Sequence, residues 1–255
     1  MIVLLIGICG AMWGSFLNSV AWYLIADTAS LLTYRSQCPQ CSSRIAWYDL
    51  IPIISWFILH GKCRNCNENI STIYPFIEGY TAALAMLAYS ALSPHTWVWY
   101  GLYSSLLIIT VHTDFRAYAI SPLVTSIWIP VGIASAYYTI LPISWQTSLL
   151  SACISYSFFA GINAIFRYIK GHETLGQGDW ELIAYVASYT GIEGVFNAIL
   201  YANVVIILWF IYVSPRSYNT IHTVRIPYGA CLAIASTLYP ILPVFAIWNI
   251  PPIFR

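Results

Sequence analysis

The chain has 255 residues, of which 60% are hydrophobic and only 7% are charged, and its mean hydropathy is +0.73. Because soluble globular domains carry about 25% charged residues, this composition excludes that class. Ten basic and nine acidic residues leave a net charge of +1, which excludes a broad basic surface for nucleic acid. The high hydrophobicity also excludes intrinsic disorder. We therefore predict a polytopic membrane protein with a single domain over residues 1–255.

Stretches without Asp, Glu, Lys or Arg mark the candidate membrane spans. They cover residues 1–26, 79–113, 117–166 and 226–254, and about 20 apolar residues are enough to cross the hydrocarbon core. The sequence predicts an all-α integral membrane protein with about eight transmembrane helices. The predicted helices are 2–24, 71–92, 96–113, 119–140, 146–167, 180–192, 195–213 and 227–248.

The basic residues predict the orientation of these spans. With eight crossings, the loops 25–70, 114–118, 168–179 and 214–226 fall on one side, and nine of the ten basic residues lie there or at its edge. An excess of Lys and Arg marks the cytoplasmic side of a membrane protein. We therefore expect these loops to be cytoplasmic and both chain termini to lie outside.

The long polar loop 25–70, inserted between the first two helices, carries two Cys-x-x-Cys pairs. Cys38 and Cys41 form the first pair, and Cys63 and Cys66 form the second. Two such pairs can complete a tetrahedral four-thiolate site, which has no open coordination position. The spacing predicts a structural zinc ion that folds the loop. Reduced thiols without metal, or oxidised pairs if the orientation is reversed, are the alternatives.

Two aspartates stand at span ends, where a carboxylate is costly and hence a functional candidate. Asp114 closes the third span and Asp179 opens the sixth, at the same predicted depth. A close pair of carboxyl groups shares a proton, so one can act as general base on a water while the other protonates a peptide carbonyl. The alternatives are a helix N-cap for Asp179, and an interfacial charge paired with Arg116 for Asp114.

Two glycines precede Asp179 in the segment Gly176-Gln177-Gly178-Asp179. Because glycine has no Cβ, Gly176 and Gly178 would let the backbone approach an extended substrate closely. We expect them to support the site.

Taken together, these residues resemble the type IV prepilin peptidases, which are integral-membrane aspartyl proteases named for a Gly-x-Gly-Asp motif. On this resemblance, Asp114 and Asp179 occupy the positions of the two catalytic aspartates. The other similar segments are Gly14-Ser15-Phe16-Leu17-Asn18, the two Cys-x-x-Cys pairs, Asp49-Leu50-Ile51-Pro52, Leu59-His60-Gly61-Lys62-Cys63, Tyr74-Pro75-Phe76-Ile77-Glu78 and Ile226-Pro227-Tyr228-Gly229.

The resemblance implies cleavage of the leader peptide of type IV prepilins or type II secretion pseudopilins. Cleavage would follow a Gly at the cytoplasmic face of the bacterial inner membrane. Family members with the cysteine loop usually also methylate the new N-terminal amine with S-adenosylmethionine, and Glu78 is our candidate for binding that amine. The implied partners are prepilins or pseudopilins and the lipid bilayer, and no nucleic acid is expected.

The chain departs from the family pattern at two places. Where the family usually has Leu-Pro-Asp after the first catalytic aspartate, this sequence has Ile120-Ser121-Pro122. Where the family usually has Lys two residues after the second, it has Glu181. A negative charge at position 181 would weaken anion stabilisation, although side chains two positions apart on a helix do not face each other.

Two functions of another class fit the same residues. A membrane transporter could use the two aspartates as an ion path, and a pilin-binding protein could use them, or the cysteine loop, for docking. Because the sequence shows no internal repeat and places both aspartates at the membrane edge, the protease is the preferred hypothesis.

Overall fold

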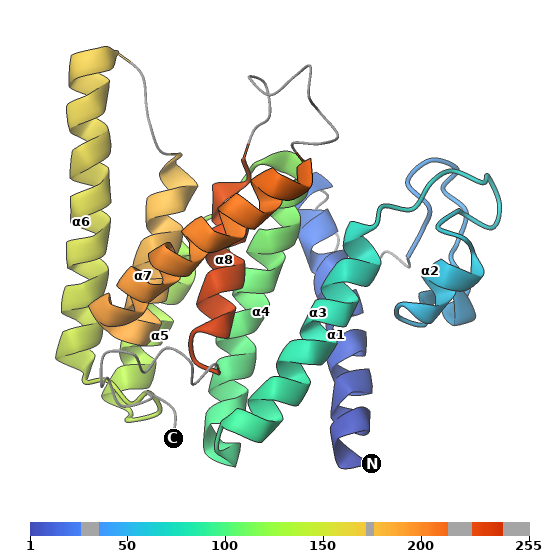
Figure 1. The fold of residues 1–255 in the computed structure, drawn as a ribbon, viewed down its shortest axis with the longest axis horizontal. Coiled ribbons are helices and arrows are strands. Elements are labelled where there is room, and N and C mark those ends of the chain that lie inside the picture. Colours follow the sequence, from blue (N-terminus) through green and yellow to red (C-terminus); the bar gives the residue numbers. More distant parts are fainter. Residues whose placement is uncertain (27–35, 172–175, 214–225, 242–255) are drawn as a thin grey trace. The chain divides into compact units, whose positions relative to one another are not determined.

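The computed structural model describes residues 1–26, 36–171, 176–213 and 226–241. These residues form helices and turns without any strand, apart from two isolated antiparallel bridges, Gln37 to Arg44 and Lys62 to Asn69. The chain divides into two compact units, Met1–Ala91 and Leu92–Arg255. The prediction of one domain stays a prediction. The helices of both units are labelled in Figure 1.

Unit 1 is built on two long helices. Its elements are α1 (Ile2–Ala26), the 3-10 helix η1 (Trp47–Leu50), α2 (Ile54–Ile58) and α3 (Ile73–Ala91). α1 and α3 pack closely because α1 presents glycine to its partner: a Cβ on Gly14 would overlap the hydroxyl of Thr81. One turn later, the buried Asn18 donates its side-chain amide to the carbonyl oxygen of Tyr74 at 3.2 Å. The segment Gly14 to Asn18 is therefore a helix-packing motif.

Unit 2 contains the remaining helices. They are α4 (Pro94–Ala117), the 3-10 helix η2 (Ser126–Trp128), α5 (Ile129–Tyr137), α6 (Trp145–Lys170), α7 (Gln177–Val213) and α8 (Tyr228–Leu238). α7 is broken at Gly191, whose φ of 73° and ψ of −179° are not helical, and its ribbon changes direction partway along (Figure 1). Glycine tolerates this positive φ without a steric penalty. The predicted boundary between the sixth and seventh helices, at residues 193–194, falls two to three residues after this break.

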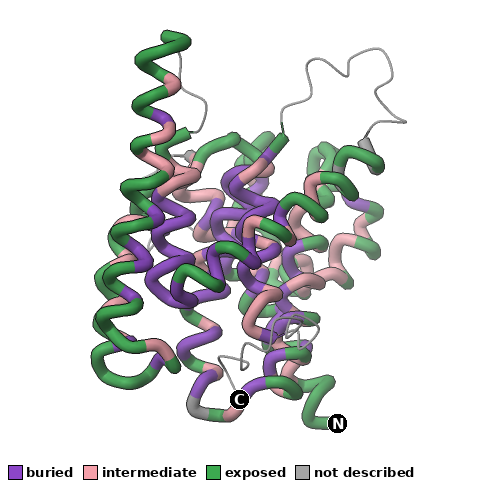
Figure 2. The backbone as a smooth tube through the Cα atoms, turned by 60° about the vertical axis from the view of Figure 1, so that its left-hand side comes forward, coloured by how far each residue is buried: buried purple, intermediate pink, exposed green. Residues whose placement is uncertain are grey.

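Aromatic rings hold α4, α7 and α8 in register. Tyr103 stacks on Trp99 and on Tyr185, with ring centroids 5.5 and 5.7 Å apart. The Tyr185 hydroxyl donates to the carbonyl of Tyr103 at 3.1 Å, and the Tyr103 hydroxyl donates to the carbonyl of Ser236 on α8 at 3.3 Å. Burial is concentrated along the first half of α7 and along α8 (Figure 2). This cluster fixes three helices that also meet at the aspartates.

One predicted helix begins too early. Residues 119–140 were expected to be helical, but α5 starts only at Ile129, after a turn and η2. Tyr118 ends α4 in the left-handed conformation, with φ 50°. Pro122 then disfavours a helix because it lacks an N–H and restricts the residue before it. Residues 118–128 are therefore a connector between α4 and α5.

Among the described residues, three helices are long and apolar enough to cross a membrane: Ile2–Ile25, Trp145–Lys170 and Gln177–Leu208. Together with the composition, they make the chain a membrane protein. The last part of the predicted helix 227–248, and Arg35, Arg216, Arg225 and Arg255 of the charge count, lie outside the described residues.

Candidate functional site

The four cysteines of the two Cys-x-x-Cys pairs lie in two similar turns of unit 1. In the first turn the N–H of Cys38 donates to the carbonyl of Ser43 at 3.0 Å, and in the second the N–H of Cys63 donates to that of Glu68 at 2.8 Å. An isolated bridge closes each turn at its base. Each Cys-x-x-Cys therefore forms a knuckle that directs both of its sulfurs to one point.

The sulfur positions fit a tetrahedral metal. All four Sγ atoms lie within 4.8 Å of one another, and those of Cys38 and Cys66 are 3.8 Å apart. A tetrahedral zinc site with Zn–S bonds of about 2.3 Å separates its sulfurs by about 3.8 Å. The predicted ligands are brought together, and the cluster could hold a metal ion.

The thiols of the cluster differ in acidity. A hydrogen bond with the Ser43 hydroxyl lowers the pKa of Cys41 to about 6. The backbone N–H of Glu68 favours the thiolate of Cys66, but loss of water and the other three sulfurs outweigh it and raise its pKa to about 12. Without a cation, four neighbouring thiolates repel one another. A divalent ion would remove this conflict, as expected of a structural metal site.

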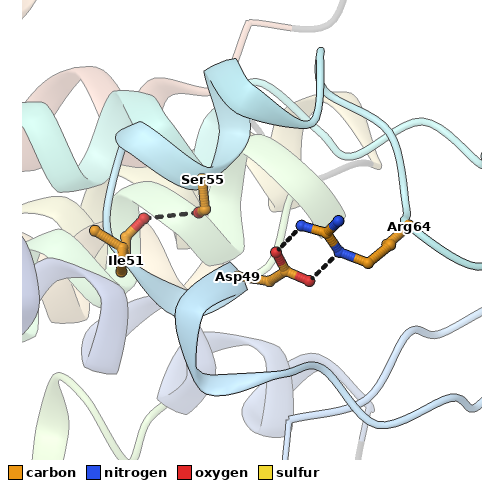
Figure 3. Close-up of polar contacts among 4 residues, drawn as sticks. All are labelled: Asp49, Ile51, Ser55 and Arg64. Atoms are coloured by element: carbon orange, nitrogen blue, oxygen red, sulfur yellow. Dashed lines mark hydrogen bonds and ion pairs between the residues drawn. The ribbon is translucent and has the colours of Figure 1, made fainter.

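An ion pair ties the second knuckle to η1. Arg64 donates from Nε and Nη2 to the two carboxylate oxygens of Asp49, at 2.9 and 2.6 Å (Figure 3). These hydrogen bonds from Arg64 lower the pKa of Asp49. Nearby, the Ser55 hydroxyl donates to the carbonyl of Ile51 at 2.7 Å at the start of α2. The loop is thus cross-linked independently of any metal.

Glu78 anchors the same loop to the helices of unit 1. Its carboxylate lies on α3, is 8% exposed, and accepts the backbone N–H of Ile53 at 2.7 Å. Ile53 has φ 64°, a left-handed conformation that a β-branched residue rarely adopts. The Ser15 hydroxyl of α1 also interacts with Glu78. A carboxylate has about four acceptor sites, so two donors leave it able to bind a further group.

Asp114 lies in the last turn of α4 and is bound by the start of α8. The N–H of Ala230 donates to its Oδ2 at 2.7 Å, and the N–H of Gly229 contributes a second hydrogen bond. The first N–H groups of a helix have no partner within it and carry the positive end of its dipole. Asp114 is 6% exposed, and these two amides supply the hydrogen bonds that its buried carboxylate needs.

Asp179 lies in the first turn of α7 and is half-buried. Its Oδ2 accepts the N–H of Gly176 at 3.2 Å. Although 65 positions separate the two aspartates, they are close enough to interact electrostatically. No ion pair joins either of them to Arg116 or to another basic side chain within the described ranges. The structure therefore brings the two predicted aspartates together in unit 2.

Ile120 of the connector packs between two glycines beside the aspartates. A Cβ on Gly178 would lie 2.6 Å from the Cβ of Ile120, and one on Gly229 would lie 2.5 Å from its Cδ1. A Cβ on Gly176 would meet only Oδ2 of Asp179, at 3.4 Å. The space beside Gly178 is therefore filled by the protein itself, whereas Gly176 is the more open of the pair.

Glu181 turns away from Asp179. It is 5% exposed, and its Oε2 accepts hydrogen bonds from the hydroxyls of Ser126, at 2.7 Å, and Thr125, at 3.3 Å. Its Oε1 accepts the side-chain amide of Gln177 at 3.0 Å. The sequence signalled Glu181 only as a departure from a pattern. Its partners on the connector, like the amides of α8, carried no signal in the sequence.

Two family models match the chain. The model of the bacterial peptidase A24 N-terminal domain matches residues 8–92, and that of the type IV leader peptidase family matches residues 101–211. The first range lies almost wholly in unit 1 and the second in unit 2. No solved structure matches the chain.

Several curated relatives match over most of their length. A prepilin leader peptidase/N-methyltransferase of Klebsiella pneumoniae is 30% identical over 204 residues, which cover 76% of this chain and 87% of the relative. A prepilin leader peptidase/N-methyltransferase of Vibrio cholerae is 28% identical over 220 residues, which cover 82% of this chain and 85% of the relative. A type 4 prepilin-like proteins leader peptide-processing enzyme of Escherichia coli O78:H11 is 27% identical over 250 residues, which cover 90% of this chain and 91% of the relative.

Proposed function

The chain belongs to the type IV leader peptidase family, and we propose that it is a membrane aspartyl endopeptidase acting on prepilins or pseudopilins. Asp114 and Asp179 are the proposed catalytic pair. The observation that carries this assignment is that two aspartates far apart in sequence interact at the ends of α4 and α7, without a basic partner among the described residues. The names of the relatives support the substrate class.

Hydrolysis needs one base and one acid. Asp114, fixed by the amides of Gly229 and Ala230, is the proposed base that takes a proton from a water molecule as its oxygen attacks the scissile carbonyl carbon. Asp179 is the proposed acid that gives its proton to the carbonyl oxygen. As the tetrahedral intermediate collapses, the proton held by Asp114 passes to the leaving amine, Asp179 takes back a hydroxyl proton as the C=O bond re-forms, and the C–N bond breaks. Two neighbouring carboxyl groups favour this singly protonated state.

The place of cleavage is proposed together with a membrane arrangement of the helices. If the helices cross the bilayer in turn, and α7 counts as two because of Gly191, then α1, α3, α4, α5, α6, the halves of α7, and α8 make eight. That topology puts Asp114 and Asp179 at the cytoplasmic face of the bacterial inner membrane, with both termini outside. A peptide bond just outside a membrane-embedded substrate helix would then be within reach. Cleavage after a leader Gly is the position we propose.

The cysteine cluster is proposed to hold zinc. Cys38, Cys41, Cys63 and Cys66 would be its ligands, and the sulfur spacing supports a four-thiolate site. Zinc with four thiolates has no open position, so its contribution is to folding of the loop rather than to hydrolysis.

Methylation of the new N-terminal amine is proposed as a second activity. It is supported by the double name of the relatives from Klebsiella pneumoniae and Vibrio cholerae. S-adenosylmethionine, when bound, supplies the methyl group. Glu78 is the proposed group that binds the amine, because it is a buried carboxylate with acceptor capacity left beside Ile53 and Ser15.

The peptidase proposal is tested by cleavage of a model prepilin in liposomes. Wild type is compared with Asp114→Asn and Asp179→Asn, and mass spectrometry locates the cut. We expect wild type to cut after the leader Gly and both variants to lose activity by about 10²- to 10⁴-fold, the contribution typical of general acid–base groups.

Asp49→Asn is the matched control, because it removes a carboxylate outside the pair. It should cut at the wild-type rate. If wild type cuts none of several pilin-like substrates, or if folded Asp114→Asn and Asp179→Asn cut as fast as it does, the peptidase proposal fails and an ion path or a docking site becomes the account of the two aspartates.

A further inference from the structure

The connector, residues 118–128, touches the first turn of α7 on both sides of Asp179. On one side, Ile120 fills the space next to Gly178. On the other, Ser126 and Thr125 donate to the carboxylate of Glu181. Asp179 thus lies between two residues that the connector holds.

The same connector begins at the other aspartate. The N–H of Tyr118 donates to the backbone carbonyl of Asp114 at 3.0 Å and ends α4. Ile120, two residues later, also packs against Gly229, whose N–H binds the carboxylate of Asp114. One short segment therefore contacts the surroundings of both carboxyl groups.

Glu181 is an unusual anchor for such a contact. A carboxylate that is 5% exposed is costly to bury unless its lone pairs are used. Here its three hydrogen-bond donors are neutral: two hydroxyls from the connector and the amide of Gln177. Removing such donors leaves a buried charge unsatisfied. Because Glu181 needs the two hydroxyls of the connector, the start of α7 is held against the connector.

The two departures from the family pattern lie on the two sides of this contact. Ile120-Ser121-Pro122 belongs to the connector, and Glu181 belongs to α7. Side chains two positions apart on a helix point in different directions, and Glu181 accordingly faces η2 rather than Asp179. Its carboxylate therefore binds the connector and does not point into the site.

We infer that Glu181 is a positioning residue, which locks the connector to α7 and so sets Asp179 relative to Asp114. This inference rests on the proposed peptidase function. Because Glu181 acts through Asp179, its replacement should lower kcat and leave KM nearly unchanged. It should also alter the pH profile of kcat, which reports the pair.

The test is a pair of compensating substitutions across the 2.7 Å hydrogen bond between Glu181 and Ser126. Glu181→Lys removes the acceptor, and Ser126→Asp places two carboxylates face to face. We expect each single variant to lose about 10- to 100-fold in kcat, which corresponds to about 1.4 to 2.8 kcal/mol. The double variant replaces the hydrogen bond by an opposite-charge contact and should recover to within about tenfold of wild type.

Two further variants separate positioning from general damage. Glu193→Lys makes the same charge change at an exposed site on α7, and it should leave kcat and the pH profile unchanged. Glu181→Gln keeps an acceptor for Ser126 and should fall between wild type and Glu181→Lys.

The inference is overturned if folded Glu181→Lys matches wild type in kcat and pH profile, or if the double variant is as poor as the product of the singles. A wild type that fails to cut any prepilin would instead overturn the peptidase proposal itself. If Glu181→Lys does not fold, Glu181→Gln and Ser126→Ala decide: wild-type kcat and pH profile in both would overturn the inference.

Discussion

The cysteine cluster of unit 1 and the aspartate pair of unit 2 are assembled in opposite ways. The four sulfurs come from two turns that are 25 positions apart, and each turn closes on itself through backbone hydrogen bonds. The aspartates are 65 positions apart, and Asp114 is bound by an amide 116 positions further along the chain. The first site depends on local geometry, whereas the second depends on how α4, α7 and α8 pack.

This difference predicts different kinds of sensitivity. A locally closed site should tolerate changes elsewhere and fail when a ligand is lost. A site made by distant helices should fail when a packing atom is added, even if both carboxylates remain. Substitutions in each unit can therefore be used to break or sharpen the comparison.

Adding a Cβ at Gly178 should have the largest effect. The new atom would lie 2.6 Å from the Cβ of Ile120, so the start of α7 must shift and overpacking should cost about 1–3 kcal/mol. We expect Gly178→Ala to lose at least about tenfold in prepilin cleavage. Gly161→Ala is the control, since its Cβ would meet nothing within 4 Å. Wild-type cleavage by Gly178→Ala would contradict the packing account.

Loss of one metal ligand should disrupt the loop while leaving hydrolysis largely intact. Cys38→Ser should release the proposed zinc, measured by elemental analysis of the purified protein, and should increase amide exchange over residues 36–70. Because the aspartates are held within unit 2, cleavage should fall by less than about tenfold, below the loss expected for a catalytic group. Cys153→Ser, on α6, is the control. A loss of cleavage as complete as that of Asp114→Asn would refute the separation of roles.

Replacing Glu78 tests the anchor of the loop. Glu78→Leu removes the acceptor for the N–H of Ile53 and should cost about 1–3 kcal/mol, the penalty of an unsatisfied buried donor. Glu78→Gln keeps an acceptor and should retain most of that stability. Thermal unfolding in detergent measures the difference. Equal stability of the two variants would show that the Ile53 contact does not hold the loop.

The ion pair of Asp49 with Arg64 should have the smallest effect. Because Arg64 lowers the pKa of Asp49 in the folded protein, the pair contributes stability at pH values above the unfolded pKa of about 3.9. That contribution is lost as the pH falls through the lower, folded pKa. Asp49→Asn should therefore unfold slightly more easily than wild type at pH 7, with the difference disappearing as Asp49 becomes protonated in the folded protein. A difference that grows towards low pH would have the wrong sign.

The sequence predicted residues better than their surroundings. Cys38, Cys41, Cys63 and Cys66 could be grouped because ligand spacing is a local pattern, and the structure brings their sulfurs together. The break of α7 at Gly191 could be anticipated from glycine beside a charge in an apolar stretch. These features depend on neighbours in the chain, which a sequence displays directly.

The surroundings of Asp114 and Asp179 could not be predicted in this way. The amide of Ala230 carries no side-chain signal, and Ile120 looks like any apolar residue. The predicted helix 119–140 began too early, because the apolar composition of this stretch masked the effect of Pro122. The negative charge of Glu181 was expected to weaken anion stabilisation in the site. The structure instead shows that Thr125 and Ser126 of the connector bind its carboxylate, which the sequence does not indicate.

The most direct test of the central claim is a double-mutant cycle on the two aspartates. Single-turnover cleavage of one prepilin is measured for wild type, Asp114→Asn, Asp179→Asn and the double variant, each with its fold checked. Groups that act as one unit show strongly non-additive losses, so the double variant should be no slower than the worse single. Losses that multiply, or a single variant that keeps wild-type rates, would contradict a catalytic pair.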